Sequence, residues 1–111
     1  MQDRVSLLIV LSTLRLHKEI TRPNKQEIVN YTLSDFINNI SEETIEGSLN
    51  QLIYKGIINC VDDTFEVHLG VRHTYVEILQ YDDTNENLDE TIAILDKRIK
   101  DIEKLDKITH S

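Results

Sequence analysis

Glycine and proline are scarce in this sequence, with three glycines and one proline among 111 residues. These residues are the usual breaks between elements, so the chain has few turns and long helices are expected to dominate. Hydrophobic residues make up 40% and charged residues 29% of the chain, which is typical of a globular protein. A chain of this length has room for one packed core and an appendage.

Cysteine and long apolar runs are also lacking. Cys60 is the single cysteine, so no internal disulfide can form and a secreted protein is not expected. The apolar stretch at residues 5–16 is interrupted by Ser12, Thr13 and Arg15. It is too short and polar for a membrane span, and it lacks a signal-peptide cleavage site. We therefore expect a cytoplasmic or nuclear protein with no membrane partner.

Positive charge is the third deficit, since the net charge is −8. Residues 1–95 carry 16 acidic side chains against 7 Lys and Arg, a balance of −9, whereas residues 96–111 carry 4 against 5, a balance of +1. Nucleic acid is held mainly by Lys and Arg that neutralise phosphates. An acidic body would need a concentrated basic patch to bind DNA well, and no such patch is visible along the chain.

Three helices are predicted in the first half of the chain. Residues 3–18 form a helix that is apolar on nearly every side, as in a helix buried in the middle of a domain. Residues 24–39 form a second helix that starts with a capping box of Asn24 and Glu27, and a break near Thr32 is left open. The third helix starts after the N-cap Ser41 and ends at Gly56, a natural left-handed C-cap. Its buried stripe is Ile45, Leu49, Leu52 and Ile53.

The pattern then changes to that of strands. Residues 57–61 and 64–69 are predicted to pair as a hairpin around the turn Asp62-Asp63. Residues 71–81 fit a strand or a helix, and their β-branched and aromatic residues favour a strand. Residues 82–87 are a polar linker. We therefore divide the chain into a domain at 1–81, a linker at 82–87 and an association helix at 88–111.

The last helix has the seam of a coiled coil, with apolar residues that alternate spacings of four and three. Its members are Leu88, Ile92, Leu95, Ile99 and Ile102. The linker before this helix favours association with a second chain, so we predict a homodimer. The alternative is that the stripe packs back on its own domain.

The order helix, helix, helix, hairpin resembles a winged helix-turn-helix domain over about residues 3–70. The resemblance is carried by Ser41-Glu-Glu-Thr-Ile45, by Leu49, by the block from Leu52 through Gly56 to Ile58, and by Asp62–Phe65. It implies a mainly α fold with a small β-hairpin wing, an α+β class. Another small α+β domain is the alternative. In DNA-binding members the third helix enters the major groove and the wing touches the backbone or the minor groove.

A second resemblance indicates a different partner. The stretch from Ser41 to Phe65 is similar to the C-terminal winged helix of the middle subunit of replication protein A, which includes a Val-Asp-Asp run near the wing. That domain is an acidic docking module for basic amphipathic helices. The resemblance implies that this chain binds a basic protein segment.

The surface that would face DNA is acidic, because the exposed positions of the third helix include Glu42, Glu43 and Glu46 beside Gly47. Carboxylates repel the phosphates that they would have to pass. The set predicted to bind a basic partner is Glu42, Glu43, Glu46, Asn50, Asp62 and Asp63. If the chain instead binds DNA as a dimeric regulator, the candidate residues are Arg22, Lys25, Ser41, Thr44, Ser48, Lys55 and Arg72. First-turn acids also stabilise a helix without any partner.

No catalytic or metal-binding motif is found. His68, His73, Glu66 and Cys60 match no tetrahedral zinc pattern. Cys60 is expected to be a small buried hydrophobe on a strand. The run from Glu46 to Leu49 lacks the second glycine of a nucleophile elbow. We therefore predict no enzyme activity, no cofactor and no metal.

Overall fold

The computed structural model describes residues 4–19, 22–81 and 87–110, and it is mainly helical with one two-stranded antiparallel sheet. The mainly α, α+β class is therefore confirmed. The chain divides into two compact units on either side of the His68–Leu69 bond. The sequence-based boundary lies after residue 81, whereas the structure groups residues 69–81 with the C-terminal helix.

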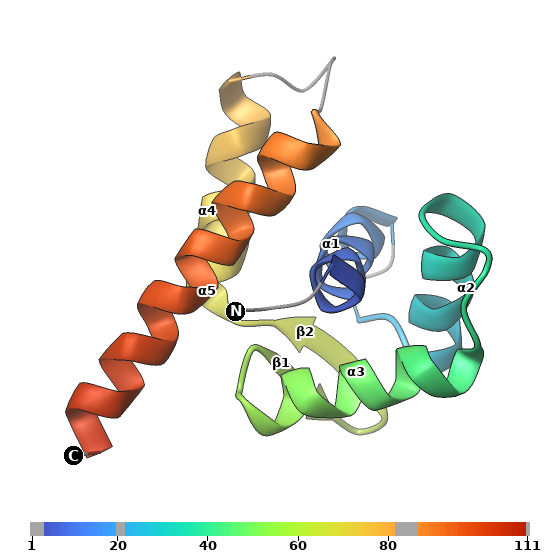
Figure 1. The fold of residues 1–111 in the computed structure, drawn as a ribbon, viewed down its shortest axis with the longest axis horizontal. Helices are drawn as coiled ribbons and strands as arrows, with labels where there is room; N and C mark the ends of the chain where they lie inside the picture. Colours follow the sequence, from blue (N-terminus) through green and yellow to red (C-terminus); the bar gives the residue numbers. More distant parts are fainter. Residues whose placement is uncertain (1–3, 20–21, 82–86, 111) are drawn as a thin grey trace. The chain divides into compact units, whose positions relative to one another are not determined.

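The first unit contains three helices and the hairpin (Figure 1): α1 (Arg4–Glu19), α2 (Lys25–Asp35), α3 (Glu42–Tyr54), β1 (Ile58–Val61) and β2 (Thr64–Val67). Helix α1 packs against α2, α3 and β2. Its side chains from Ser6 to Leu14 are all buried. The central position predicted for this helix is confirmed, and the reason is its apolar circumference.

Buried hydroxyl groups join α1 to α2 inside this core. Ser12 Oγ donates to the carbonyl oxygen of Leu8 at 2.8 Å, and it lies 2.9 Å from Thr32 Oγ1. Thr13 makes the equivalent bond to Ile9 at 2.9 Å. Since a buried hydroxyl without a partner is costly, these bonds explain how polar residues fit the middle of an apolar helix.

Helix α2 starts as predicted but ends early. Asn24 Oδ1 accepts from the backbone N–H of Glu27 at 2.9 Å, and the Glu27 carboxylate accepts from the Asn24 N–H at 3.0 Å, which confirms the capping box. The predicted extension to residue 39 is wrong. Phe36 leaves the helical region with φ −120°. Its ring lies 6.0 Å from the ring of Tyr31 and 4.9 Å under the Arg15 guanidinium.

The hairpin is confirmed, with Cα partners that run from Ile58↔Val67 to Val61↔Thr64. A further segment pairs with the other edge of β2. The Phe65 N–H donates to the Pro23 carbonyl at 2.9 Å, and Asn24 forms an isolated bridge with Thr64. Proline lacks an N–H and suits this edge position, where only its carbonyl is required.

The second unit contains α4 (Leu69–Tyr81) and α5 (Leu88–His110), which pack against each other and run in opposite directions (Figure 1). The strand favoured for residues 71–81 is therefore wrong. Val71 and Tyr75 lie one helical turn apart and are buried, so packing of one helix face overrides the β-propensity of these residues. The predicted linker lies outside the described residues except for Asn87, whose side chain accepts from the Glu90 N–H at 3.1 Å.

Candidate functional site

Helix α3 presents one face to the core and the opposite face to solvent. Its N-cap is confirmed, because Ser41 Oγ accepts from the Thr44 N–H at 3.2 Å. Ile45, Leu49 and Leu52 form the buried face. The exposed positions at spacings of four, three and four are Glu43, Gly47, Asn50 and Tyr54, which we call the α3 outer stripe.

Two residues of this stripe stand out. Tyr54 is 89% exposed, so its ring contributes almost nothing to the folded core. A Cβ added at Gly47 would meet no atom within 4 Å, and the backbone φ of Gly47 is not positive. An exposed glycine inside a helix is about 1 kcal/mol less favourable than alanine. Gly47 was named among the exposed positions from sequence but left out of the predicted set, and Tyr54 was missed. The sequence pattern that indicates an exposed Tyr54 is its position on the side of the helix opposite Ile45 and Leu52.

The turn of the hairpin consists of Asp62 and Asp63, whose φ angles are +51° and +63°. Two consecutive positive values define the tight turn that matches the twist of a two-residue hairpin. Aspartate tolerates this region better than most residues do, although glycine and asparagine suit it best. Both carboxylates are exposed at the tip.

Ion pairs divide the predicted acidic set into two groups. Within that set Glu46 forms an ion pair, because its Oε1 lies 3.7 Å from Lys25 Nζ. Outside the set, Glu66 Oε2 lies 3.8 Å from Arg22 Nε. The other four acids, Glu42, Glu43, Asp62 and Asp63, are exposed and form no ion pair with the described residues. The negative charge of the candidate surface is therefore uncompensated at both ends and partly neutralised at Glu46.

The positive side chains of the first unit are engaged wherever the structure describes them. Arg22 and Lys25 face glutamates, and Arg15 lies over the Phe36 ring. Arg4 and Lys55 also take part in hydrogen-bonding, ionic or ring contacts. The described part of this unit thus offers anions, and not cations, to a charged partner.

The DNA-binding set is divided between the two units. Ser41 and Thr44 use their hydroxyls in the α3 cap, 2.9 Å from each other. Ser48 is half-buried. Arg72 belongs to α4 in the other unit, and its Nε is buried with no hydrogen-bond partner among the described residues.

A hollow of about 400 Å³ brings the start of α2 next to the hairpin turn. It is lined by Asn24, Lys25, Gln26, Asp63 and Phe65. The hollow therefore joins one residue of each predicted set, Lys25 and Asp63. Through the Lys25–Glu46 ion pair this region continues to α3.

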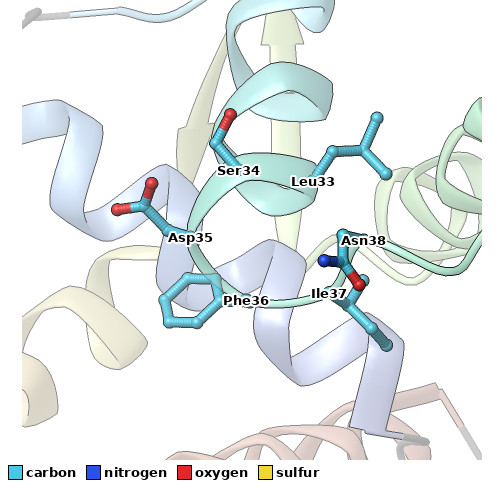
Figure 2. Close-up of a pocket in the computed structure, with 6 residues that line it drawn as sticks. All are labelled: Leu33, Ser34, Asp35, Phe36, Ile37 and Asn38. Atoms are coloured by element: carbon cyan, nitrogen blue, oxygen red, sulfur yellow. The ribbon is translucent and has the colours of Figure 1, made fainter.

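A second, smaller hollow of about 200 Å³ lies where α2 ends (Figure 2). Figure 2 shows Leu33 and Ile37 on one side of the chain and Asp35 and Phe36 on the other. None of the predicted site residues lines it. The sequence predicts a helix over residues 36–39 and therefore gives no sign of this hollow.

The predicted seam of the last helix is largely covered within the single chain. Ile92, Leu95, Ile99 and Ile102 are buried, with Leu95 and Ile99 at 0% exposure, and Leu88 is half-buried. Helix α5 packs on α4, which lies within the predicted domain at 1–81, so this packing agrees with the alternative that the stripe packs back on its own domain. While α5 keeps this arrangement, these side chains are not available to a second copy.

The expectation for Cys60 is wrong, since its side chain is exposed. Its neighbours Asn59 and Val61 on β1 are exposed as well. Within the described ranges no three His, Cys, Asp or Glu side chains are grouped so that they could hold a metal ion. Among the helices described, none combines the length and apolar character required to cross a membrane.

Comparison with protein-family models, with curated proteins and with solved structures gives no match for this chain.

Proposed function

We propose that this chain is a non-catalytic binding module of winged-helix type that docks a basic segment of a partner protein. The fold supports this class: three helices precede a hairpin, and Pro23 and Asn24 add a short paired segment to the far edge of β2. In this proposal α3 is the recognition helix and the β1–β2 hairpin is the wing. The partner contacts the helix and the wing tip.

The observation that carries the proposal is the uneven pairing of charges. Glu42 and Glu43 on α3 and Asp62 and Asp63 on the wing have no ion pair with described residues, whereas the described cations around them are engaged. Potential of one sign attracts and orients a partner of the opposite sign. DNA would meet the same four carboxylates, and phosphates would be repelled.

Helix–hairpin domains of this kind also bind DNA, so the test compares the two ligands directly. The full chain is titrated by fluorescence anisotropy against a labelled Lys/Leu amphipathic peptide, a Glu/Leu peptide of the same length, and duplex DNA. We expect the Lys/Leu peptide to bind, and we expect no binding of the Glu/Leu peptide or of the duplex DNA. DNA affinity at micromolar concentration or tighter, falling steeply between about 50 and 200 mM salt, would overturn the proposal, because that slope counts phosphates contacted.

A charge variant locates the surface. Glu42→Gln with Glu43→Gln is expected to weaken binding of the Lys/Leu peptide about five- to twentyfold, the effect of two ion pairs of moderate strength. Asp35→Asn is the matched control, since Asp35 is an exposed acid of the same unit at the end of α2. Equal losses in both variants would mean that the peptide responds only to the overall charge of the protein.

A further inference from the structure

No contact with the described residues requires glycine at position 47. Its backbone is not in the left-handed region, and a Cβ there would meet nothing within 4 Å. Alanine would fit and would favour the helix. A glycine on an exposed helix face is, however, what close approach by another backbone requires. This observation indicates a partner that crosses α3 at its middle.

The rest of the α3 outer stripe fits an amphipathic partner. Tyr54 at one end is 89% exposed, and tyrosine combines a large apolar area with little loss of side-chain entropy on contact. Glu43 at the other end, next to Glu42, is exposed and without an ion pair to described residues. A helix surface has no unpaired backbone groups for an added strand, so the fitting partner is another helix.

Helix α5 of the same chain carries the complementary pattern on its exposed side. We call this side the α5 outer face; its members lie on the arc away from the buried residues Leu95 and Ile99. Its residues are the exposed Ile94, Lys97, Lys104 and Leu105 and the half-buried Arg98 and Asp101. Ile94 is 44% and Leu105 is 58% exposed. Lys97, Arg98 and Lys104 have no ion pair with described residues, whereas Lys100 pairs with Asp96 at 3.0 Å.

The two surfaces also match in length. Glu43 to Tyr54 and Ile94 to Leu105 each span about three helical turns, roughly 16 Å. An antiparallel alignment sets Lys104 against Glu43 and Ile94 against Tyr54. It also opposes the two helix dipoles. Asp101 is the one acid on the α5 outer face.

Resting on the proposed function, we infer that the basic segment docked by α3 is the α5 outer face of a second copy of this chain. In a symmetric dimer this contact occurs twice, as α3 to the partner's α5 and as α5 to the partner's α3. The contact uses the exposed side of α5, and the buried seam residues such as Leu95 stay inside each chain. Formation of the dimer occupies both acidic stripes, so another basic protein competes with self-association.

Charge exchange tests this dimer directly. Variant one carries Glu42→Lys and Glu43→Lys, and variant two carries Lys97→Glu and Lys104→Glu. Sedimentation equilibrium of the full-length wild type is expected to give a dimer that weakens as salt is raised. Each variant alone places like charges in both contacts, and its association constant is expected to fall at least about tenfold. A mixture of the two variants restores opposite charges in both contacts and is expected to form the mixed dimer.

Uncharged variants test the shape of the contact. Gly47→Gln fills the point of closest approach and is expected to weaken the dimer about tenfold, although it raises the unfolding midpoint because glutamine favours a helix. Tyr54→Ala is expected to weaken it to a similar degree, and Tyr54→Phe to keep most of the affinity. Asp35→Lys is the charge-reversal control and is expected to leave the molecular mass of the dimer, measured by sedimentation equilibrium, unchanged. Circular dichroism checks that each variant folds.

The outcomes separate this inference from the proposed function. A wild type that stays monomeric up to millimolar concentration while the Lys/Leu peptide still binds would overturn the α3–α5 dimer and leave the docking function standing. A dimer that persists in both charge variants would also overturn the inference. Failure of the peptide to bind a monomeric wild type would overturn both.

Discussion

Helices α3 and α5 are both two-sided, and the comparison shows what an apolar stripe does and does not reveal. In each helix the periodic apolar residues are buried within the single chain, Leu49 and Leu52 in α3 and Leu95 and Ile99 in α5. In each, the opposite side is exposed and charged. The exposed side of α3 ends in unpaired glutamates, and that of α5 carries lysines. Periodicity identifies the side chains that are buried, but not the element that covers them.

The largest effect is expected from the buried side of α3. Leu49→Ala is expected to lower the free energy of unfolding by about 2–5 kcal/mol, through lost transfer energy and the cavity left behind. Tyr54→Ala on the exposed side is expected to change it by less than about 0.5 kcal/mol. Urea denaturation of both variants measures the contrast. A similar loss of unfolding free energy in the Leu49→Ala and Tyr54→Ala variants would mean that α3 is not oriented as described.

The buried side of α5 gives the next effect. Leu95→Ala is expected to destabilise the protein by about 2–3 kcal/mol, since its side chain has 0% exposure. If the apolar seam instead joins two chains, the same variant lowers the molecular mass by light scattering, and the stability then depends on protein concentration. We expect no such concentration dependence from the seam.

Much of the first unit could be predicted from sequence because its signals are local. The cap at Asn24 and Glu27, the N-cap Ser41 and the left-handed Gly56 (φ +78°), which directly follows the C-cap Lys55, each depend on residues within one turn. They needed no knowledge of distant packing. For the same reason the hairpin around Asp62 and Asp63 was predicted, although residues 57, 68 and 69 lie outside its two strands.

The errors lie where distant packing decides. Val71 and Tyr75 are β-prone, yet they lie on a helix because one face of α4 packs against α5. Phe36 has the spacing of a helix residue, yet it leaves the helix and lies beneath Arg15. The pairing of Lys25 with Glu46 joins residues that the sequence assigned to opposite functions. Ion pairs between distant segments are not visible in a single sequence.

An effect of moderate size is expected in the wing turn, where a change to glycine is compared with the same change in α2. Asp63→Gly is expected to stabilise the protein by about 0.5–1 kcal/mol, because φ +63° favours glycine and Asp-Gly is a preferred sequence for this turn. The unfolding midpoint measured by circular dichroism checks the sign. A matched Asp35→Gly change lies in the last turn of α2, where φ is not positive, and it is expected to destabilise instead.

The smallest effect is expected from the ion pair between α2 and α3. Lys25 Nζ and Glu46 Oε1 are 3.7 Å apart, and their side chains are 54% and 38% exposed. Water screens such a pair, so a double-mutant cycle with Lys25→Ala and Glu46→Ala is expected to give a coupling of about 0.2–0.5 kcal/mol. The effect of this pair on peptide binding is expected to be easier to detect than its effect on stability. Lys25→Ala leaves the charge of Glu46 uncompensated and is expected to strengthen binding of the Lys/Leu peptide about twofold. If the peptide binds more weakly to Lys25→Ala, the cation itself contacts the partner and α3 is not a purely acidic surface.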